Sequence, residues 1–308
     1  MSTPFEVGLA GAVQQRRPKS DGWKTADKKA AAPFGYPRNF LENRFVYLTV
    51  SPRARGLSIG VNLSPAGTCN FDCLYCDVDH SIPRPDAVID CEVAGRELER
   101  TLALVQSEEL QRHAPYSGLP PELLQLRHVA LSGDGEPTES PQFLAAVETV
   151  VHIRARGQFP FFKVVVITNA SGLDLPDVQT GLSLLTSKDE VWAKLDAGTE
   201  GYLNLVNRTS VPLSKILSNI LITAKKRPVI IQSLFSSVDG YAPSVAEISA
   251  YAERLRELKT AGANIPLVQI YSATRPRATE RVTHLPLRTM AEIASTVRRI
   301  TGLRAEVF

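Results

Sequence analysis

Six segments with strand character, each followed by a segment with helical character, run along the chain from residue 57 nearly to its end. The strand segments are short apolar runs, whereas the helical segments repeat their apolar residues with helical spacing. This alternation predicts a parallel sheet, because each helix carries the chain back to the start of the next strand. The expected strands are residues 57–63, 127–131, 163–168, 190–195, 229–235 and 267–272, and the expected helices are residues 92–106, 141–154, 176–185, 213–226, 245–260 and 289–301.

Polar side chains inside three of these strands favour a barrel over an open sheet. In the fourth strand, alternation places Trp192, Lys194 and Asp196 on one face and apolar residues on the other. Gln232 and Gln269 interrupt the next two strands. A parallel strand buried on both faces reads as continuously apolar, and burying a lysine beside an aspartate is costly unless the two are paired. The pattern therefore predicts an α/β fold, a partial (β/α)6 TIM-like barrel, with its chemistry at the carboxyl ends of the strands.

Three of the four cysteines lie in one loop directly after the first expected strand. Cys69, Cys73 and Cys76 have C-x3-C-x2-C spacing, and the aromatic Tyr75 precedes the last of them. Three thiolates from one tight loop can bind three irons of an iron–sulfur cube and leave the fourth iron open to a small molecule. An open metal position is typical of catalysis rather than of a structural site.

A zinc site is the alternative interpretation of these cysteines. Zinc would take a fourth ligand, which Cys91, Asp77 or His80 could supply. Structural zinc motifs, however, usually pair their cysteines as C-x2-C at two separated places. The concentration of three thiols in one loop favours the iron–sulfur interpretation.

Three further groups of residues follow the next strands at the same expected edge. In Gly133-Asp134-Gly135-Glu136, two glycines allow the backbone to approach a small ligand and Glu136 supplies a fixed acceptor, although such a run by itself is also an ordinary turn. Thr168 and Asn169 end the third strand and could equally form a helix cap. Lys194 and Asp196 either contact a ligand or form an ion pair that fixes the strand end.

Together these runs resemble the radical SAM superfamily. The cysteine spacing is similar to its signature, in which the unligated iron of a 4Fe-4S cluster chelates the amino and carboxylate groups of S-adenosylmethionine. The Gly-Asp-Gly-Glu run looks like the Gly-Gly-Glu element that binds the methionyl ammonium, and Thr168-Asn169 resembles a Thr-Asn-Gly run near the ribose. The runs 194–198 and 268–271, with Arg275-Pro276, extend the resemblance over roughly residues 45 to 290 to a branch similar to the wyosine tRNA synthases.

The resemblance implies a partial barrel of the radical SAM type and an enzyme that cleaves S-adenosylmethionine reductively. The resulting 5′-deoxyadenosyl radical abstracts hydrogen from a substrate, and a flavodoxin or ferredoxin type protein supplies the electron. The implied metal ligands are Cys69, Cys73 and Cys76; the implied cofactor-binding residues are Tyr75, Gly133, Asp134, Gly135, Glu136, Thr168, Asn169, Lys194, Gln232 and Gln269; and the implied catalytic residues are Lys194 and Asp196.

The substrate is less constrained by the sequence. The wyosine synthases carry additional cysteines for a second cluster, whereas this chain has only Cys91 left, so the resemblance transfers the cofactor chemistry and not the wyosine reaction. RNA is one expectation, because arginines flank the expected barrel mouth, although they also suit a solvated rim. The alternatives are a peptide or small metabolite, or a metal-binding module without catalysis. The arginines are Arg53, Arg55, Arg275, Arg277 and Arg281.

The first forty residues differ in composition from the rest. They hold seven basic and three acidic residues, a net charge of +4, without sustained periodicity. We expect residues 1–40 to form a disordered arm, or alternatively a contact with nucleic-acid phosphate, ahead of a barrel domain at 41–308. The longest apolar stretch, 159–167, is too short to cross a bilayer, and no apolar signal-peptide stretch is evident. The sequence thus predicts a cytoplasmic protein without membrane association and leaves its oligomeric state open.

Overall fold

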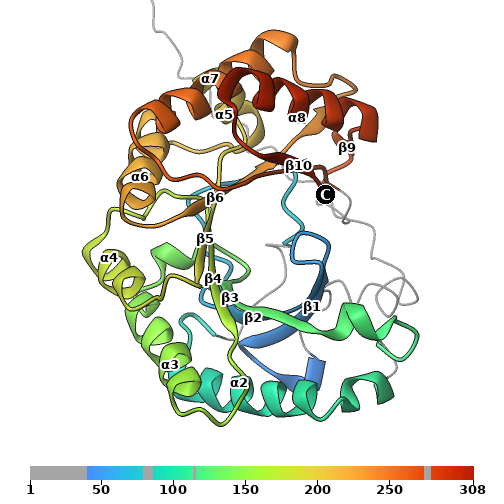
Figure 1. Cartoon of the computed structure of the whole chain (residues 1–308), viewed down its shortest axis with the longest axis vertical. Coiled ribbons are helices and arrows are strands. Elements are labelled where there is room, and N and C mark those ends of the chain that lie inside the picture. The colour runs from blue at the N-terminus through green and yellow to red at the C-terminus, as the bar shows by residue number, and fades with distance from the viewer. Residues whose placement is uncertain (1–39, 79–85, 114–115, 274–278) are drawn as a thin grey trace, which may run out of the picture.

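The computed structural model, which describes residues 40–78, 86–113, 116–273 and 279–308, contains an eight-stranded sheet curled into a half-barrel (Figure 1). The strand order is β1-β2-β3-β4-β5-β6-β8-β10. Strand β1 is antiparallel to β2, and every other neighbouring pair is parallel. The strands are β1 (Val46–Ser51), β2 (Gly56–Asn62), β3 (Leu126–Ser132), β4 (Lys163–Thr168), β5 (Glu190–Lys194), β6 (Val229–Leu234), β8 (Val268–Tyr271) and β10 (Ala305–Val307).

Helices cover the convex face of the sheet (Figure 1). Each parallel strand from β2 to β8 is followed by helical segments before the next strand of the sheet, which confirms the predicted partial (β/α)6 barrel. Within the described residues, none of the helices combines the length and apolar character needed to span a membrane. The helices are α2 (Cys91–Gln106), α3 (Phe143–Ala155), α4 (Pro176–Ser183), α5 (Glu200–Val206), α6 (Leu213–Lys226), α7 (Val245–Thr260) and α8 (Leu287–Thr301), with single 3-10 turns at Phe40–Glu42, Glu109–Arg112, Pro121–Leu124 and Pro137–Glu139.

The structure contains all six strand–helix units that the sequence predicts. The sequence analysis missed the elements at the two edges of the sheet. It did not predict β1, which pairs antiparallel with β2, or β10, which is only three residues long. It also missed α5 and the small antiparallel pair β7 (Ser236–Val238) and β9 (Val282–His284). Most of these elements are too short to show a repeating pattern of apolar residues, so their secondary structure depends on contacts with the rest of the fold. The predicted arm at residues 1–40 lies almost entirely outside the described residues.

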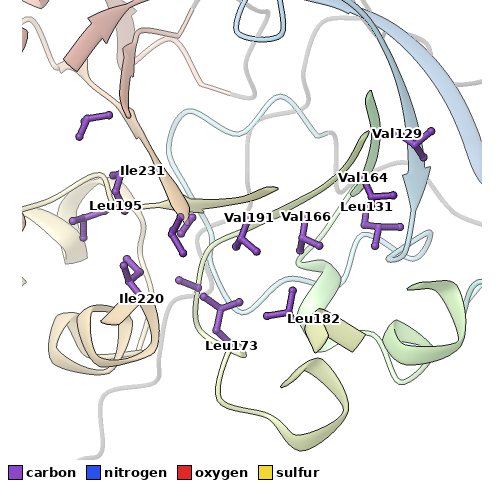
Figure 2. Close-up of a cluster of buried hydrophobic side chains, with 14 of the residues drawn as sticks. Val129, Leu131, Val164, Val166, Leu173, Leu182, Val191, Leu195, Ile220 and Ile231 are labelled. Atoms are coloured by element: carbon purple, nitrogen blue, oxygen red, sulfur yellow. The ribbon is translucent and has the colours of Figure 1, made fainter. Parts of the chain in front are cut away.

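The strands bury a different set of side chains on each face. Val191, Ala193 and Leu195 belong to the large core between the sheet and its helices, which Figure 2 shows for this and the neighbouring strands. Trp192 instead packs with Val165 and Ile230 in a separate cluster. The alternation predicted for β5 is therefore confirmed, and Trp192 lies on the concave side of the sheet, referred to below as the lumen.

The hairpin formed by β1 and β2 reaches across the lumen. Its tip residue Ala54 packs against the cluster that contains Trp192. Arg55 Nη2 lies 3.1 Å from a carboxylate oxygen of Glu306 in β10, so the tip reaches the far edge of the sheet (Figure 1). Arg53 stacks on the ring of Tyr271, with 4.2 Å between its Cζ and the ring centroid. The hairpin thereby bridges the open side of the half-barrel.

These contacts change the interpretation of the arginines assigned to a nucleic-acid rim. Arg55 is paired with Glu306, and Arg281 is paired with Asp239 at 2.6 Å. Arg53 faces Tyr271 rather than an outer rim. Arg275 and Arg277 lie outside the described residues. The part of the chain that the structure describes therefore gives no cluster of unpaired surface arginines at these positions.

A buried ion pair ties α3 to the loop before β5 and yields a first prediction. The Arg154 guanidinium donates to both carboxylate oxygens of Asp189, at 2.6 and 3.0 Å, and Asp189 also accepts from the Val164 N–H at 2.8 Å. Burial alone would raise the pKa of Asp189, but the hydrogen bonds from Arg154 and from backbone N–H groups hold it below its usual value. The carboxylate thus stabilises the fold above the pKa of about 3.9 that it has in the unfolded chain, and this contribution is lost as the pH falls through its lower folded value.

Replacing Asp189 by alanine should therefore destabilise the protein at pH 7 by about 3 kcal/mol or more, because it leaves a buried guanidinium without its partner. Denaturant unfolding at pH 7 and at lower pH measures this loss, and we expect the difference from the unsubstituted protein to shrink below about pH 4. The exposed Asp177 of α4 provides the control, with an expected change of about 0.5 kcal/mol or less. An equal loss for both variants would contradict the prediction.

Candidate functional site

The three clustered cysteines lie on a loop that begins where β2 ends. The backbone N–H groups of Asp72 and Leu74 donate to the carbonyls of Asn207 and Val206, at 3.1 and 2.9 Å. Leu74 is buried, which holds the loop against the protein. The loop is therefore anchored to the end of α5, at the carboxyl edge of the parallel strands.

The three cysteines of this loop are partly buried, and the sulfurs of two of them accept hydrogen bonds from amide donors. Cys69 Sγ accepts a hydrogen bond from the Phe71 N–H at 3.4 Å, and Cys73 Sγ accepts one from Asn207 Nδ2 at 3.3 Å. Burial raises the pKa of Cys69 to about 12 and also raises that of Cys73. Thiolates in such surroundings need a bound cation, and N–H donors of this kind stabilise sulfur that is bound to metal. The chemistry of the donor set fits an iron–sulfur cluster.

The same geometry argues against a single zinc ion. Among the described residues, no three cysteine, histidine, aspartate or glutamate side chains are arranged to hold one metal ion. Cys91 starts α2 and lines a small cavity with Ala94 and Ala146, on the side of the sheet that carries α2 and α3. His80 lies outside the described residues. In a cubic cluster each thiolate binds a different iron, so the three sulfurs need not converge on one point.

The Gly133–Glu136 run lies directly against the cysteine loop. The Glu136 N–H donates to the carbonyl of Thr68 at 3.1 Å, and a Cβ on Gly135 would lie 1.8 Å from that same oxygen. Gly133 has a φ of 152°, and a Cβ there would lie 2.0 Å from Asn62 Oδ1. Asn62 also donates to the Asp134 carboxylate at 2.9 Å. Both glycines are thus required for the close approach of two loops.

The Glu136 carboxylate is buried and engaged by the protein itself. It accepts hydrogen bonds from the hydroxyls of Thr138 and Thr168, at 2.6 and 2.5 Å, and from the Asn169 N–H at 2.6 Å. Burial raises its pKa, and these donors oppose the rise. Glu136 therefore joins the carboxyl ends of β3 and β4, which brings Thr168 and Asn169 to the site. A contact between Glu136 and the cosubstrate stays a prediction.

Lys194 and Asp196 meet Tyr75 of the cysteine loop. Lys194 Nζ lies 3.4 Å from an Asp196 oxygen, donates to the Tyr271 hydroxyl at 3.1 Å, and lies 4.8 Å from the centroid of the Tyr75 ring. The Tyr75 hydroxyl donates to Asp196. Burial alone lowers the pKa of Lys194, but the Asp196 carboxylate outweighs it and raises the pKa, so the amine stays protonated. The predicted pair thus exists and contacts the cysteine loop.

Gln232 and Gln269 lie beside this pair but bind each other. Lys194, Gln232 and Gln269 occupy neighbouring register positions across β5, β6 and β8. The Gln232 amide donates to the Gln269 side-chain carbonyl at 2.8 Å, and both residues are buried. The three side chains form one polar row on the lumen side of the sheet, as the alternation in the sequence predicted.

Asn207 is a residue of this site that the sequence analysis missed. Its side-chain amide donates to Cys73 Sγ at 3.3 Å, to the Tyr75 hydroxyl at 2.8 Å and to Asp196 at 3.1 Å. Its carbonyl Oδ1 is buried without a hydrogen-bond partner. Asn207 follows α5 and lies 134 positions from Cys73, and nothing in its local sequence signals this role.

Comparisons with known proteins bear on the fold. No family model and no curated protein matches the sequence. Among solved structures, TYW1 with a lysine-pyruvate adduct bound is 16% identical over 83% of this chain and 84% of its own, with a TM-score of 0.54. SuiB of Streptococcus suis bound to S-adenosylmethionine is 13% identical over 83% of this chain and 52% of its own, with a TM-score of 0.56, so this chain spans about half the length of SuiB. A mutant form of spore photoproduct lyase is 10% identical over 84% of this chain and 78% of its own, with a TM-score of 0.55.

These three proteins are radical SAM enzymes, and the half-barrel described here is their fold. The fold predicted from the sequence resemblance is thereby confirmed.

Proposed function

We propose that this protein is a radical SAM enzyme that holds a 4Fe-4S cluster on Cys69, Cys73 and Cys76. One observation carries the proposal. The loop with the three cysteines packs against a second loop, whose glycines permit the close contact, at the carboxyl edge of a radical SAM half-barrel. Such a cluster, when bound, supplies one electron to S-adenosylmethionine and releases a 5′-deoxyadenosyl radical that abstracts hydrogen from a substrate.

The residues of this chain would position and shield that chemistry. The N–H groups of Phe71 and Asn207 donate to the thiolate sulfurs. Backbone groups of 133–135 are the proposed contacts of the cosubstrate, because glycine lets the backbone approach a small ligand. The protonated Lys194 amine, which Tyr75 and Asp196 hold in place, would attract a carboxylate group of the bound ligand. Thr168, Asn169, Gln232 and Gln269 stay proposed cofactor contacts.

The class of substrate is a separate part of the proposal. The solved neighbours include SuiB bound to the precursor peptide SuiA as well as TYW1, so the fold does not choose between RNA and peptide. A tRNA base stays one hypothesis, but the pairing of Arg55 and Arg281 weakens the argument from surface arginines. A flavodoxin or ferredoxin type electron donor and a cytoplasmic location complete the proposal.

Anaerobic purification and reconstitution test the proposed function. We expect about four irons and four sulfides per chain, and an electron paramagnetic resonance signal in the dithionite-reduced protein that changes on addition of S-adenosylmethionine. Reduced protein should convert S-adenosylmethionine to 5′-deoxyadenosine, measured by chromatography. A reconstituted protein that binds zinc instead of iron, or that forms no 5′-deoxyadenosine, would overturn the proposal.

A second prediction concerns Asn207. Replacing Asn207 by leucine removes the N–H donor from Cys73 Sγ, and hydrogen bonds to cluster sulfurs favour the reduced, more negative state. The reduction potential of the reconstituted cluster should therefore fall, as measured by a redox titration followed by electron paramagnetic resonance. Thr209→Val is the control, because Thr209 bonds to the Asn70 carbonyl of the same loop and to no sulfur. A shift of equal size in both variants would argue against a direct effect of the Asn207 amide.

A further inference from the structure

Arg53 is a partly buried cation that has no counterion among the described residues. It lies in the turn between β1 and β2, and among the described residues no carboxylate forms an ion pair with it and no acceptor takes a hydrogen bond from it. Its Nε is fully buried and unpartnered. Its neighbour Arg55 is paired with Glu306. A buried N–H donor without an acceptor is costly, and the rest of this partly exposed guanidinium is free of protein acceptors within the described residues, so the group is available to a ligand.

The groups around Arg53 leave its charge uncompensated. Lys194 is paired with Asp196, and Lys163 is paired with Glu190, so a carboxylate already balances the charge of each lysine. His128, another titratable group whose pKa responds to Arg53, is buried edge-on against Trp192. Burial, followed by the positive charges of Lys163 and Arg53, lowers the pKa of His128 to about 3, which keeps this ring neutral. Within the described part of the chain, the charge of Arg53 thus has no carboxylate paired with it.

Arg53 is also held in a defined orientation beside the candidate site. Its Cζ lies 4.2 Å from the centroid of the Tyr271 ring, and the hydroxyl of that same ring accepts a hydrogen bond from Lys194 Nζ at 3.1 Å. Stacking on an aromatic face leaves the in-plane N–H groups of a guanidinium available. Two parallel N–H donors match the two oxygens of a carboxylate or of a phosphate.

We propose that Arg53, stacked on Tyr271 beside Lys194, binds the carboxylate or phosphate group of the substrate in the lumen. The assignment of this ligand as the substrate depends on the proposed function, whereas the binding of an anion at Arg53 does not. The substrate class is then a small anionic molecule, or a larger molecule that inserts one such group past the β1–β2 hairpin.

The test uses the anaerobically purified full-length protein and a tryptophan that reports on the lumen. The chain has two tryptophans, and Trp23→Phe leaves only Trp192, which shares a cluster with Ala54 of the hairpin. Acetate and pyruvate probe the carboxylate, and inorganic phosphate probes the phosphate. We expect a saturable change in Trp192 fluorescence with a carboxylate or with phosphate, and a rise in melting temperature with the same anion.

Arg53→Met in this background should weaken binding by about tenfold or more, since it removes the charge-assisted hydrogen bonds to the anion. Arg55→Met removes the same charge from the same hairpin and should change binding by about twofold or less, because Arg55 is an exposed, paired side chain. Arg53→Lys, which keeps the charge but lacks the two parallel N–H donors, should bind the anion with intermediate affinity. The melting temperature without anion shows that each variant is folded.

No saturable response to either kind of anion, or equal affinities for Arg53→Met and Arg55→Met, would overturn the anion site. Reductive cleavage of S-adenosylmethionine by the unsubstituted protein is measured separately. A failure of that reaction would overturn the proposed function while leaving an observed Arg53-dependent anion site intact.

Discussion

Replacing Cys73 by alanine is expected to abolish cluster binding and, with it, the cleavage of S-adenosylmethionine. The sulfur of Cys73 accepts a hydrogen bond from Asn207, and the N–H of the neighbouring Leu74 donates to the Val206 carbonyl. A cube that keeps only two thiolates is not retained, and the rate of 5′-deoxyadenosine formation should fall by at least about three orders of magnitude. Cys69→Ala and Cys76→Ala should have the same effect. Iron content, absorbance and product formation measure it.

Cys91→Ala is the matched control for these variants. Cys91 is a free cysteine like the others, but it lines the cavity beside α2 and α3. Its removal should leave iron content and cleavage close to those of the unsubstituted protein. If Cys91→Ala lost iron as completely as Cys73→Ala, the assignment of the three loop cysteines as the complete ligand set would be wrong.

Gly135→Ala is expected to produce the second large effect. Its new Cβ would lie 1.8 Å from the Thr68 carbonyl oxygen, which belongs to the backbone of the cysteine loop and cannot rotate away. Relief requires the two loops to separate, which also breaks the hydrogen bond from the Glu136 N–H to Thr68. We expect a loss of about 3 kcal/mol or more in the free energy of unfolding, together with reduced iron binding.

Denaturant unfolding and iron content test this expectation side by side. Gly118→Ala is the control, because a Cβ at Gly118 would meet no atom within 4 Å, and its effect on stability should be about 0.5 kcal/mol or less. A Gly135→Ala protein that keeps both its stability and its iron would show that the two loops separate without cost, and would remove the steric argument for the glycine.

Much of the fold and part of the site could be predicted from the sequence because their signals are local. The alternation in β5 identified the lumen-facing Lys194, and the spacing of Cys69, Cys73 and Cys76 identified the loop. Strand alternation and ligand spacing each involve only a few consecutive residues, so both can be recognised in the sequence without knowledge of the fold.

Other parts of the site depend on residues that meet only in the folded protein. Asn207 has no motif, and its role arises because α5 ends beside the cysteine loop. Arg53 and Arg55 look alike in the sequence, but one stacks on Tyr271 and the other pairs with Glu306 at the opposite end of the chain. Glu136 has the predicted position, but its hydrogen bonds from Thr138, Thr168 and Asn169 join two strand ends that the motif alone does not bring together.

The anchoring of the cysteine loop to the end of α5 affects how the protein matures. The carbonyls of Val206 and Asn207 that fix Leu74 and Asp72 come from a segment more than a hundred residues later, beyond β3, β4 and β5. Contacts of such long separation form late, because the chain between them must first be closed into a loop. Insertion of the proposed cluster into a shaped site would therefore follow synthesis and collapse of the first five sheet strands, and a nascent chain released earlier would carry its three cysteines in an unshaped loop.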